Sequence, residues 1–191
     1  MSVARTEVRG FDLNRHSGRR YRGGKAYAVS SGLGMPRLWS YATAAVLDGF
    51  GEALGDDGDG PGGEALEAAV RAARQTLARR CDALIERMLP DATLIASGLS
   101  NGALHVISAG PGRVYLHRGG QPKRLTPRDE SNEGILKGTL ARCSVDLEPE
   151  DIVLIGSVSA FSVRAIARLA SVLDADRRTP PNVLASLLTE P

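Results

Sequence analysis

The sequence predicts an α+β domain, and three patterns lead to this class. Apolar residues recur with helical spacing in segments 39–54 and 64–88, short β-type runs fill the middle of the chain, and helical patterns return after residue 161. Strands grouped between helices, without regular strand–helix alternation, are typical of α+β proteins with antiparallel sheets. Because 191 residues suit one core, we expect a single domain over 1–191.

The N-terminal part of the chain is expected to contain one strand and two helices. A polar, basic leader over 1–17 comes first, and segment 25–30 follows as a short strand. The Ala-rich segment 39–54 predicts a helix, and the spacing of leucine, alanine and valine over 64–88 predicts a long amphipathic helix. Between them, 55–63 (GDDGDGPGG) is expected to be a flexible loop, because glycine and proline dominate it.

The middle of the chain is rich in strand and turn signals. Four β-type runs occur in succession, at 93–99, 104–109, 113–117 and 122–126. Tight-turn sequences separate them: Asn-Gly at 101–102, Gly-Pro-Gly at 110–112 and Gly-Gly at 119–120. We therefore expect four consecutive antiparallel strands, then further strands at 143–147 and 152–156, and helices at 162–173 and 182–188.

Composition excludes several classes of protein. The net charge of +2 creates no field that would gather nucleic acid or anionic membrane, and 4% aromatic residues leave little for base stacking. No apolar run approaches the roughly 20 residues that span a bilayer. Cys81 and Cys143 form neither a disulfide framework nor a zinc motif, which is typical of a reduced cytosol. We expect a cytoplasmic protein that binds neither nucleic acid nor membrane.

Four short segments carry local patterns that occur together in one family. Segment 20–25 (RYRGGK) begins with an arginine, and 29–34 (VSSGLG) is a strand that ends in a glycine turn. Segment 109–113 (AGPGR) precedes a strand, and 155–160 (IGSVSA) leads from a strand into a helix. In order and spacing, from about Gly18 onward, they resemble the motifs of the metal-dependent protein phosphatases of the PPM type. The resemblance implies an α-β-β-α sandwich of two mostly antiparallel sheets flanked by helices.

The residues that would hold metal in such a phosphatase differ here. The resemblance implies that Lys25 stands at one family aspartate, that Ser31 replaces the aspartate that bridges both metals, and that Gly32 is the glycine that offers a backbone carbonyl. Pro111 and Val158 replace two further aspartates. The family's last element, an Arg-Asp-Asn segment followed by a strand, has no counterpart. The resemblance therefore implies a degenerate version of the fold that is either minimal by nature or shortened at its C-terminus.

These replacements predict an inactive protein. Mg²⁺ and Mn²⁺ need several oxygen ligands, usually with carboxylates, and phosphoester hydrolysis of this type needs water activated by the metal. Without carboxylates at these positions, we expect no metal cofactor and no catalytic residue. The first hypothesis is a pseudophosphatase that acts as a binding or regulatory module in phosphorylation signalling.

The basic residues of the first motif suggest what this module binds. Arg20, Arg22 and Lys25 lie close together in the sequence, and arginine can grip a phosphate with two parallel hydrogen bonds while lysine adds a point charge. We expect a metal-free pocket for a phosphorylated or acidic protein partner. The alternative is that these cations form an ordinary solvated basic segment.

Two further hypotheses stay open. An active serine/threonine phosphatase would need Mg²⁺ or Mn²⁺ held by an unusual set of carboxylates, such as Asp48, Asp146 and Asp151. Segment 48–51 (DGFG) imitates the family's Asp-Gly-x-Gly motif, but we prefer Ser31 at that position because a helix should follow the glycine turn. The other hypothesis is a domain that only builds an assembly.

The three histidines show no pattern that would give them a chemical role. His16, His105 and His117 stand at no spacing typical of nucleophilic catalysis or of metal binding, and none belongs to a motif. We expect them to be ordinary core or surface residues.

Overall fold

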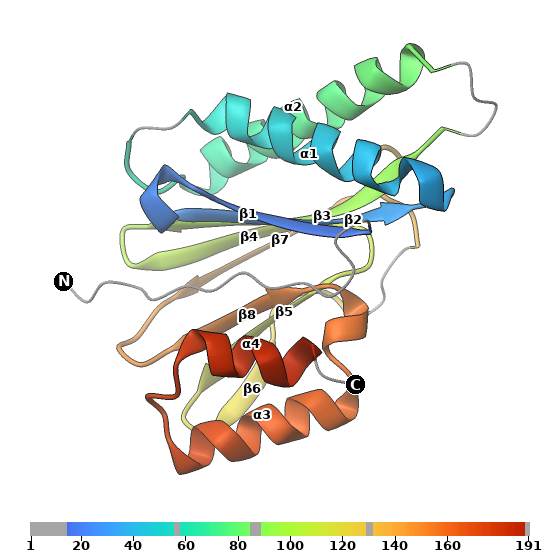
Figure 1. Ribbon diagram of the computed structural model, residues 1–191. Helices are drawn as coiled ribbons and strands as arrows, with labels where there is room; N and C mark the ends of the chain where they lie inside the picture. The colour runs from blue at the N-terminus through green and yellow to red at the C-terminus, as the bar shows by residue number, and fades with distance from the viewer. Residues whose placement is uncertain (1–14, 56–57, 85–88, 129–131, 190–191) are drawn as a thin grey trace.

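The computed structural model describes residues 15–55, 58–84, 89–128 and 132–189, and it shows a sandwich of four layers. Helices α1 (Trp39–Leu54) and α2 (Gly63–Asp82) cover one sheet, and α3 (Val163–Ala175) and α4 (Pro181–Thr189) cover the other (Figure 1). The predicted α-β-β-α arrangement is confirmed. None of the described helices is long and apolar enough to cross a membrane.

Both sheets are antiparallel, and they differ in width. The first has five strands in the order β1-β2-β3-β4-β7, with bounds His16–Tyr21, Ala26–Leu33, Asp91–Ser100, Ala103–Ala109 and Leu140–Asp146. The second has three strands in the order β6-β5-β8, with bounds Gln121–Arg124, Arg113–Arg118 and Ile152–Gly156. Short 3₁₀ turns lie at Arg22–Gly24, Pro36–Leu38 and Val158–Ala160.

The prediction of four consecutive paired strands is wrong at one connection. Strand β4 pairs with β7, and β5 pairs with β6 and β8, so the turn 110–112 carries the chain from the first sheet to the second. Gly110 takes φ of 78°, and a Cβ there would lie 2.6 Å from the carbonyl oxygen of Glu133. Positive φ and this close contact both require glycine, and they redirect the chain away from a hairpin.

Two predicted boundaries also change. His16 and Ser17, assigned to the leader 1–17, form the start of β1, while 1–14 lie outside the described residues. Helix α2 spans Gly63–Asp82 and ends before the predicted residue 88. Helix α1 and strand β8 have the predicted bounds.

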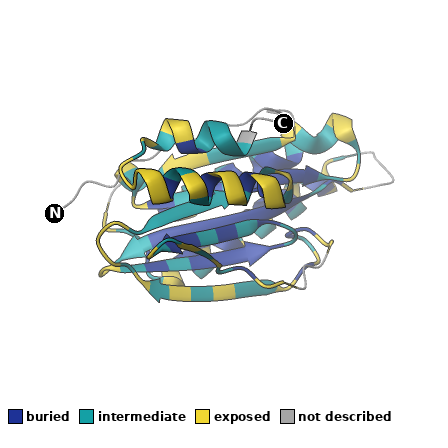
Figure 2. Ribbon diagram, turned by 90° about the horizontal axis from the view of Figure 1, so that it is seen from below, coloured by how far each residue is buried: buried dark blue, intermediate teal, exposed yellow. Residues whose placement is uncertain are grey.

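Three groups of buried apolar side chains hold the layers together. Small alanines of β2, β3 and α1 let the first helix pair pack closely on its sheet, around Phe50, Leu47 and Leu77. Between the sheets lie Ile95, Leu104, Val106 and Val114, and beneath the second sheet lie Leu169, Leu173 and Leu184. Figure 2, seen from below, shows exposed residues along the outer faces of α3 and α4, while the central strands are largely buried.

Candidate functional site

Three of the positions expected to have lost metal ligands lie on segments that meet at one end of the sandwich. The backbone N–H of Ser31 near the end of β2 donates to Thr93 Oγ1 at 3.1 Å. A Cβ at Gly110, beside Pro111, would lie 3.2 Å from the Thr93 methyl, and one at Gly112 would lie 3.7 Å from the carbonyl oxygen that ends β8. The end of β2, the turn 110–112 and the end of β8 before Val158 therefore adjoin.

Ser31 lies at this end of the sandwich, and its hydroxyl forms a hydrogen bond within the chain. The Ser31 side chain is buried, and its Oγ lies 2.7 Å from Nδ1 of His16, which faces it across the β1–β2 ladder. The neighbouring Ser30 hydroxyl donates to the carbonyl oxygen of Thr93 at 2.8 Å. A hydroxyl, an imidazole and a threonine thus occupy the surroundings where the resemblance implied a carboxylate.

Sequence reasoning missed His16, and the structure corrects the expectation that it is an ordinary residue of the leader. His16 lies 15 residues before Ser31, in a segment without an alternating pattern, and only the register of β1 on β2 brings the two together. A strand signal over 16–21 would have revealed the pair. The polar sequence HSGRRY carries no such signal.

The described residues at this end do not fit a divalent cation. Ser31 and Pro111 offer no anion, Val158 is apolar, and the N–H of Gly32 donates to the carbonyl oxygen of Arg15 at 2.7 Å. Across the described part of the chain, no three His, Cys, Asp or Glu residues lie together in a way that could hold a metal ion. Hard cations need several oxygens with compensating charge, and this donor set does not supply them.

Lys25 lies at the opposite end of β2. Its carbonyl oxygen accepts from the N–H of Leu99 at 2.8 Å, and six residues of extended chain, about 20 Å, separate it from Ser31. The expected placement of Lys25 beside Ser31 in one degenerate metal site is therefore wrong in geometry. The reason is that β2 runs straight from the hairpin turn to Ser31.

Two of the three predicted anion-binding cations hold the glycine-rich loop. Arg22 donates to the carbonyl oxygens of Leu54 and Asp59, the latter at 2.8 Å, and Lys25 Nζ lies 3.0 Å from Asp59 Oδ1. The hydrogen bond from Lys25 lowers the pKa of Asp59. Both cations therefore have partners within the chain, and the Asp59 side chain is fully exposed to solvent.

Arg20 is placed differently. It lies opposite Tyr27 in the β1–β2 ladder, and its side chain runs past Gly24. Since Ala26 and Ala28 face the helices, Tyr27 and its partner Arg20 face the second sheet, on the same side as Ser31. Among the described residues no carboxylate pairs with Arg20.

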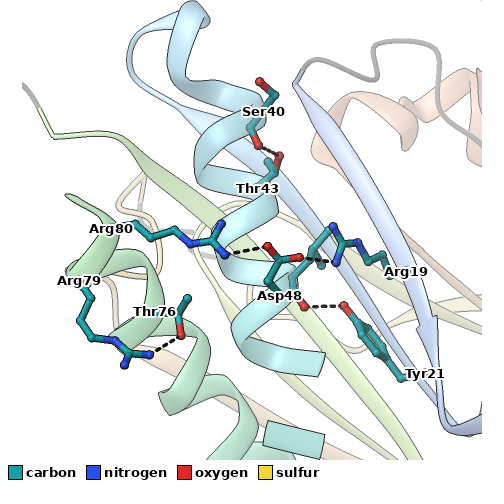
Figure 3. A network of polar contacts seen from close by, with 9 residues as sticks. Arg19, Tyr21, Ser40, Thr43, Asp48, Thr76, Arg79 and Arg80 are labelled. Atoms are coloured by element: carbon teal, nitrogen blue, oxygen red, sulfur yellow. Dashed lines mark hydrogen bonds and ion pairs between the residues drawn. The ribbon is translucent and has the colours of Figure 1, made fainter. Parts of the chain in front are cut away.

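Asp48, the first alternative metal ligand, belongs to a structural network (Figure 3). It lies in α1, and its two oxygens accept from Arg19 of β1 at 2.6 Å and from Arg80 of α2 at 2.9 Å. Burial raises its pKa, but the arginine hydrogen bonds outweigh this and lower the pKa overall. The network lies on the helix side of the first sheet, on the opposite face from Ser31.

The other two alternative ligands share one arginine far from Ser31. Arg118 donates to both oxygens of Asp151, at 2.9 and 2.6 Å, and to the carbonyl oxygen of Asp146 at 2.7 Å. Asp151 also accepts from the N–H of Glu148 at 2.8 Å. Arg118 ends β5, whereas the turn 110–112 precedes that strand. The structure therefore does not assemble Asp48, Asp146 and Asp151 into one site.

Comparison with known proteins finds relatives only among solved structures. No family model matches the sequence, and no curated protein matches it. The PPM Ser-Thr phosphatase MsPP from Mycobacterium smegmatis aligns with a TM-score of 0.69 at 18% identity, over 98% of this chain and 88% of that chain. The catalytic domain of the phosphatase PstP, in complex with two manganese ions, aligns at 0.74 and 20%, over 97% and 88%. The S. agalactiae serine/threonine phosphatase aligns with a TM-score of 0.73 at 14% identity, over 97% of this chain and 90% of that chain.

These similarities establish the fold. The chain is an α-β-β-α sandwich of the phosphatase type. The end of the sandwich at Ser31 is lined by hydroxyl, imidazole and apolar groups. That fold is the one of the PPM serine/threonine phosphatases, and the resemblance inferred from the motifs is confirmed at this level.

Proposed function

We propose that this domain is a catalytically inactive, PPM-like phosphatase domain that binds an acidic or phosphorylated protein segment in phosphorylation signalling. The observation that carries the proposal is the part-buried contact of Ser31 with His16, because Ser31 stands where the resemblance implies a bridging aspartate. PPM-like catalysis needs metal-bound water as nucleophile and metal charge against the developing negative charge. A neutral hydroxyl and an imidazole supply neither.

Arg20 supports the binding part of the proposal. It faces the second sheet, on the same face of the first sheet as Ser31 but nearer the Lys25 end of β2, and its guanidinium can offer two parallel hydrogen bonds to a phosphate or carboxylate. Fold alone does not determine function, so the proposal depends on this side chain and on the donor set rather than on the similarity to phosphatases.

Lys25 can join this site if its contact with the Asp59 carboxylate yields. The ion pair between Lys25 and Asp59 is exposed, and exposed pairs contribute only about 0–1 kcal/mol. An incoming phosphate, with more charge than one carboxylate, therefore competes with Asp59 at low cost. A ligand that displaces the loop carboxylate frees Lys25 to join Arg20, whereas Arg22 stays bonded to the carbonyl oxygens of Leu54 and Asp59.

The test combines metal binding with turnover. The purified chain is titrated with MnCl₂ by calorimetry, and hydrolysis of p-nitrophenyl phosphate is followed in the same buffer, with the PstP catalytic domain as positive control. We expect no saturable binding heat and no manganese-dependent turnover for this chain.

Stoichiometric Mn²⁺ binding together with turnover would overturn the proposal and favour an active phosphatase with an unusual metal site. Asp48→Asn, Asp146→Asn and Asp151→Asn would then be compared for loss of the binding heat. A control variant, Ser31→Ala, removes the hydroxyl without adding charge and is expected to leave the calorimetric baseline unchanged.

A further inference from the structure

A small cavity lies between the two sheets, beside β7. Its volume is about 150 Å³, and a cavity of this size can hold a molecule as large as benzene. The inner faces of β4 and β7 form one side of it, and the segment that follows β6 forms the other. Strand β7 is the edge of the first sheet opposite to β1, so the cavity is separate from the contact of His16 with Ser31.

Ser108 points into this cavity. Its neighbours in β4, Ile107 and Ala109, pack toward α1 and α2, so the Ser108 side chain faces the space between the sheets. Ser108 is only 6% exposed, and its hydroxyl makes no hydrogen bond to any described residue. Leaving a buried hydroxyl without a partner costs free energy. A ligand that brings a polar atom to this point would therefore be stabilised.

Cys143 is the reactive group beside the cavity. Its side chain packs with the apolar group between the sheets, and it is partly exposed, so a reagent from solvent can reach the sulfur. The thiol has one long contact, 4.0 Å to the carbonyl oxygen of Ser144. Cys81, by contrast, is buried, and its sulfur lies 3.5 Å from the carbonyl oxygen of Pro90. Cys143 thus combines access from solvent with an adjoining cavity.

The ladder between β4 and β7 places the thiol and the hydroxyl at the two ends of a short span. Val106 lies opposite Cys143, and Ser108 lies opposite Ala141. Ser108 is therefore the diagonal neighbour of Cys143 on the same face, and such neighbours are about 7–8 Å apart. A short arm attached to the Cys143 sulfur can cover this span and end at the Ser108 hydroxyl.

The lining decides what kind of arm fits. Leu125 and Pro127, which follow β6, offer apolar contact together with Val106 of β4. Arg142 is the one charged residue in the described lining, and its guanidinium binds Glu67 of α2, on the other face of the sheet. The lining that the structure describes therefore brings no free charge into the cavity. An uncharged arm of methylene groups with a terminal hydroxyl or amide matches these surroundings.

We infer that Cys143 is a modification site for an uncharged low-molecular-weight thiol, which is held as a mixed disulfide with its arm in the cavity. In this step the Cys143 thiolate attacks one sulfur of the disulfide form of that thiol. A sulfur–sulfur bond forms to Cys143, the bond within the reagent breaks, and its other half leaves as a thiolate that takes up the proton released by Cys143. The Cys143 sulfur is oxidised and the leaving sulfur is reduced, so the disulfide itself is the oxidant.

The experiment uses the full chain and 2-hydroxyethyl disulfide, the oxidised form of 2-mercaptoethanol, whose arm consists of methylene groups and a hydroxyl. The chain is equilibrated with set ratios of this disulfide to 2-mercaptoethanol, and intact mass spectrometry gives the exchange constant. An unstructured peptide with the sequence of 141–145 is the reference thiol. We expect one adduct, absent in Cys143→Ser, and an exchange constant at least about tenfold above that of the peptide, because burial of the methylene groups and a hydrogen bond to Ser108 stabilise the adduct.

Two variants test the cavity itself. Ser108→Ala removes the hydroxyl and should lower the exchange constant by about threefold to tenfold. Ser144→Ala is the matched control and should leave it unchanged, because the Ser144 hydroxyl lies on the other face of the sheet, where it contacts His105. Ala141→Leu places apolar atoms inside the cavity and should lower the constant at least about tenfold. Circular dichroism checks that each variant is folded.

Two outcomes would overturn the inference. One is an exchange constant for the folded chain equal to that of the peptide, and the other is an equal constant in the wild type and in Ser108→Ala. Either result would show that Cys143 reacts as an ordinary exposed thiol without help from the cavity. The proposed function does not depend on this result, since neither Ser31 nor Arg20 lines the cavity.

Discussion

Replacing Asp151 with asparagine distinguishes a carboxylate that holds the fold from one that holds a metal. The Asp151 side chain is only 4% exposed and accepts three hydrogen bonds, two from Arg118 and one from the N–H of Glu148. These contacts join the end of β5 to the segment before β8. Loss of the charge leaves a partly exposed guanidinium with a weaker acceptor. We expect a loss of about 2–3 kcal/mol in the free energy of unfolding.

Urea unfolding followed by circular dichroism measures this loss, and thermal unfolding provides a second reading. For a chain of this length, about 2–3 kcal/mol corresponds to a fall of roughly 4–12 °C in Tm. Asp146→Asn is the matched control, because only the main-chain oxygen of Asp146 contacts Arg118. Its expected effect is within about 0.5 kcal/mol.

The pH dependence follows from the same contact. The hydrogen bonds from Arg118 lower the pKa of Asp151 below its ordinary value. A lowered pKa contributes stability that is present above the unfolded value, about 3.9, and is lost as pH falls through the folded value. The difference in free energy of unfolding between the wild type and Asp151→Asn should therefore have its full size at pH 7 and shrink below about pH 4.

Two results would refute this reasoning. Equal effects of Asp151→Asn and Asp146→Asn would show that the Arg118 contact does not stabilise the fold. A rise in wild-type Tm with Mn²⁺ that disappears in Asp151→Asn would show that the carboxylate binds metal.

Three further changes probe close packing, a buried phenol and the two thiols. Gly60→Ala should lower the free energy of unfolding in urea by at least about 2 kcal/mol, because its Cβ would lie 1.5 Å from the carbonyl oxygen of Leu99 in β3. Gly62→Ala should lower it far less, because the nearest atom, Ser100 Oγ, would lie 3.9 Å from its Cβ. Burial raises the pKa of Tyr21 to about 12, so ultraviolet titration should show a late tyrosinate step that Tyr21→Phe removes, and the stability that the raised pKa contributes is lost from about pH 10 upward. A rapid thiol reagent should modify partly exposed Cys143 in the folded chain and buried Cys81, whose pKa burial raises, only after unfolding; equal rates would contradict the structure.

Local patterns predicted the elements whose side chains repeat with a clear period. Helix α1 and strand β8 have the predicted bounds, because an apolar stripe or a continuous apolar run defines each of them without reference to distant residues. The PPM-like sandwich was implied by the resemblance of four short motifs to that family. Strand β1 was missed, because an edge strand with only half-buried and exposed residues needs no alternating pattern.

The candidate site depended on pairings between residues far apart in the sequence. The motif reading identified Ser31, Pro111 and Val158 on segments that meet at one end, but it placed Lys25 beside them and overlooked His16. Strand geometry and register decide both the distance of Lys25 from Ser31 and the pairing of His16 with Ser31. Residues along one strand are separated by about 3.3 Å per position, and the register of β1 on β2 places His16 opposite Ser31.

Sequence alone determined the class of fold and which residues carry no carboxylate, because both are properties of residue type and local order. Tertiary structure alone decided the contact of His16 with Ser31 and the loop contacts of Arg22 and Lys25. The physical reason is that side-chain partners and sheet edges arise from long-range pairing, which local periodicity does not encode.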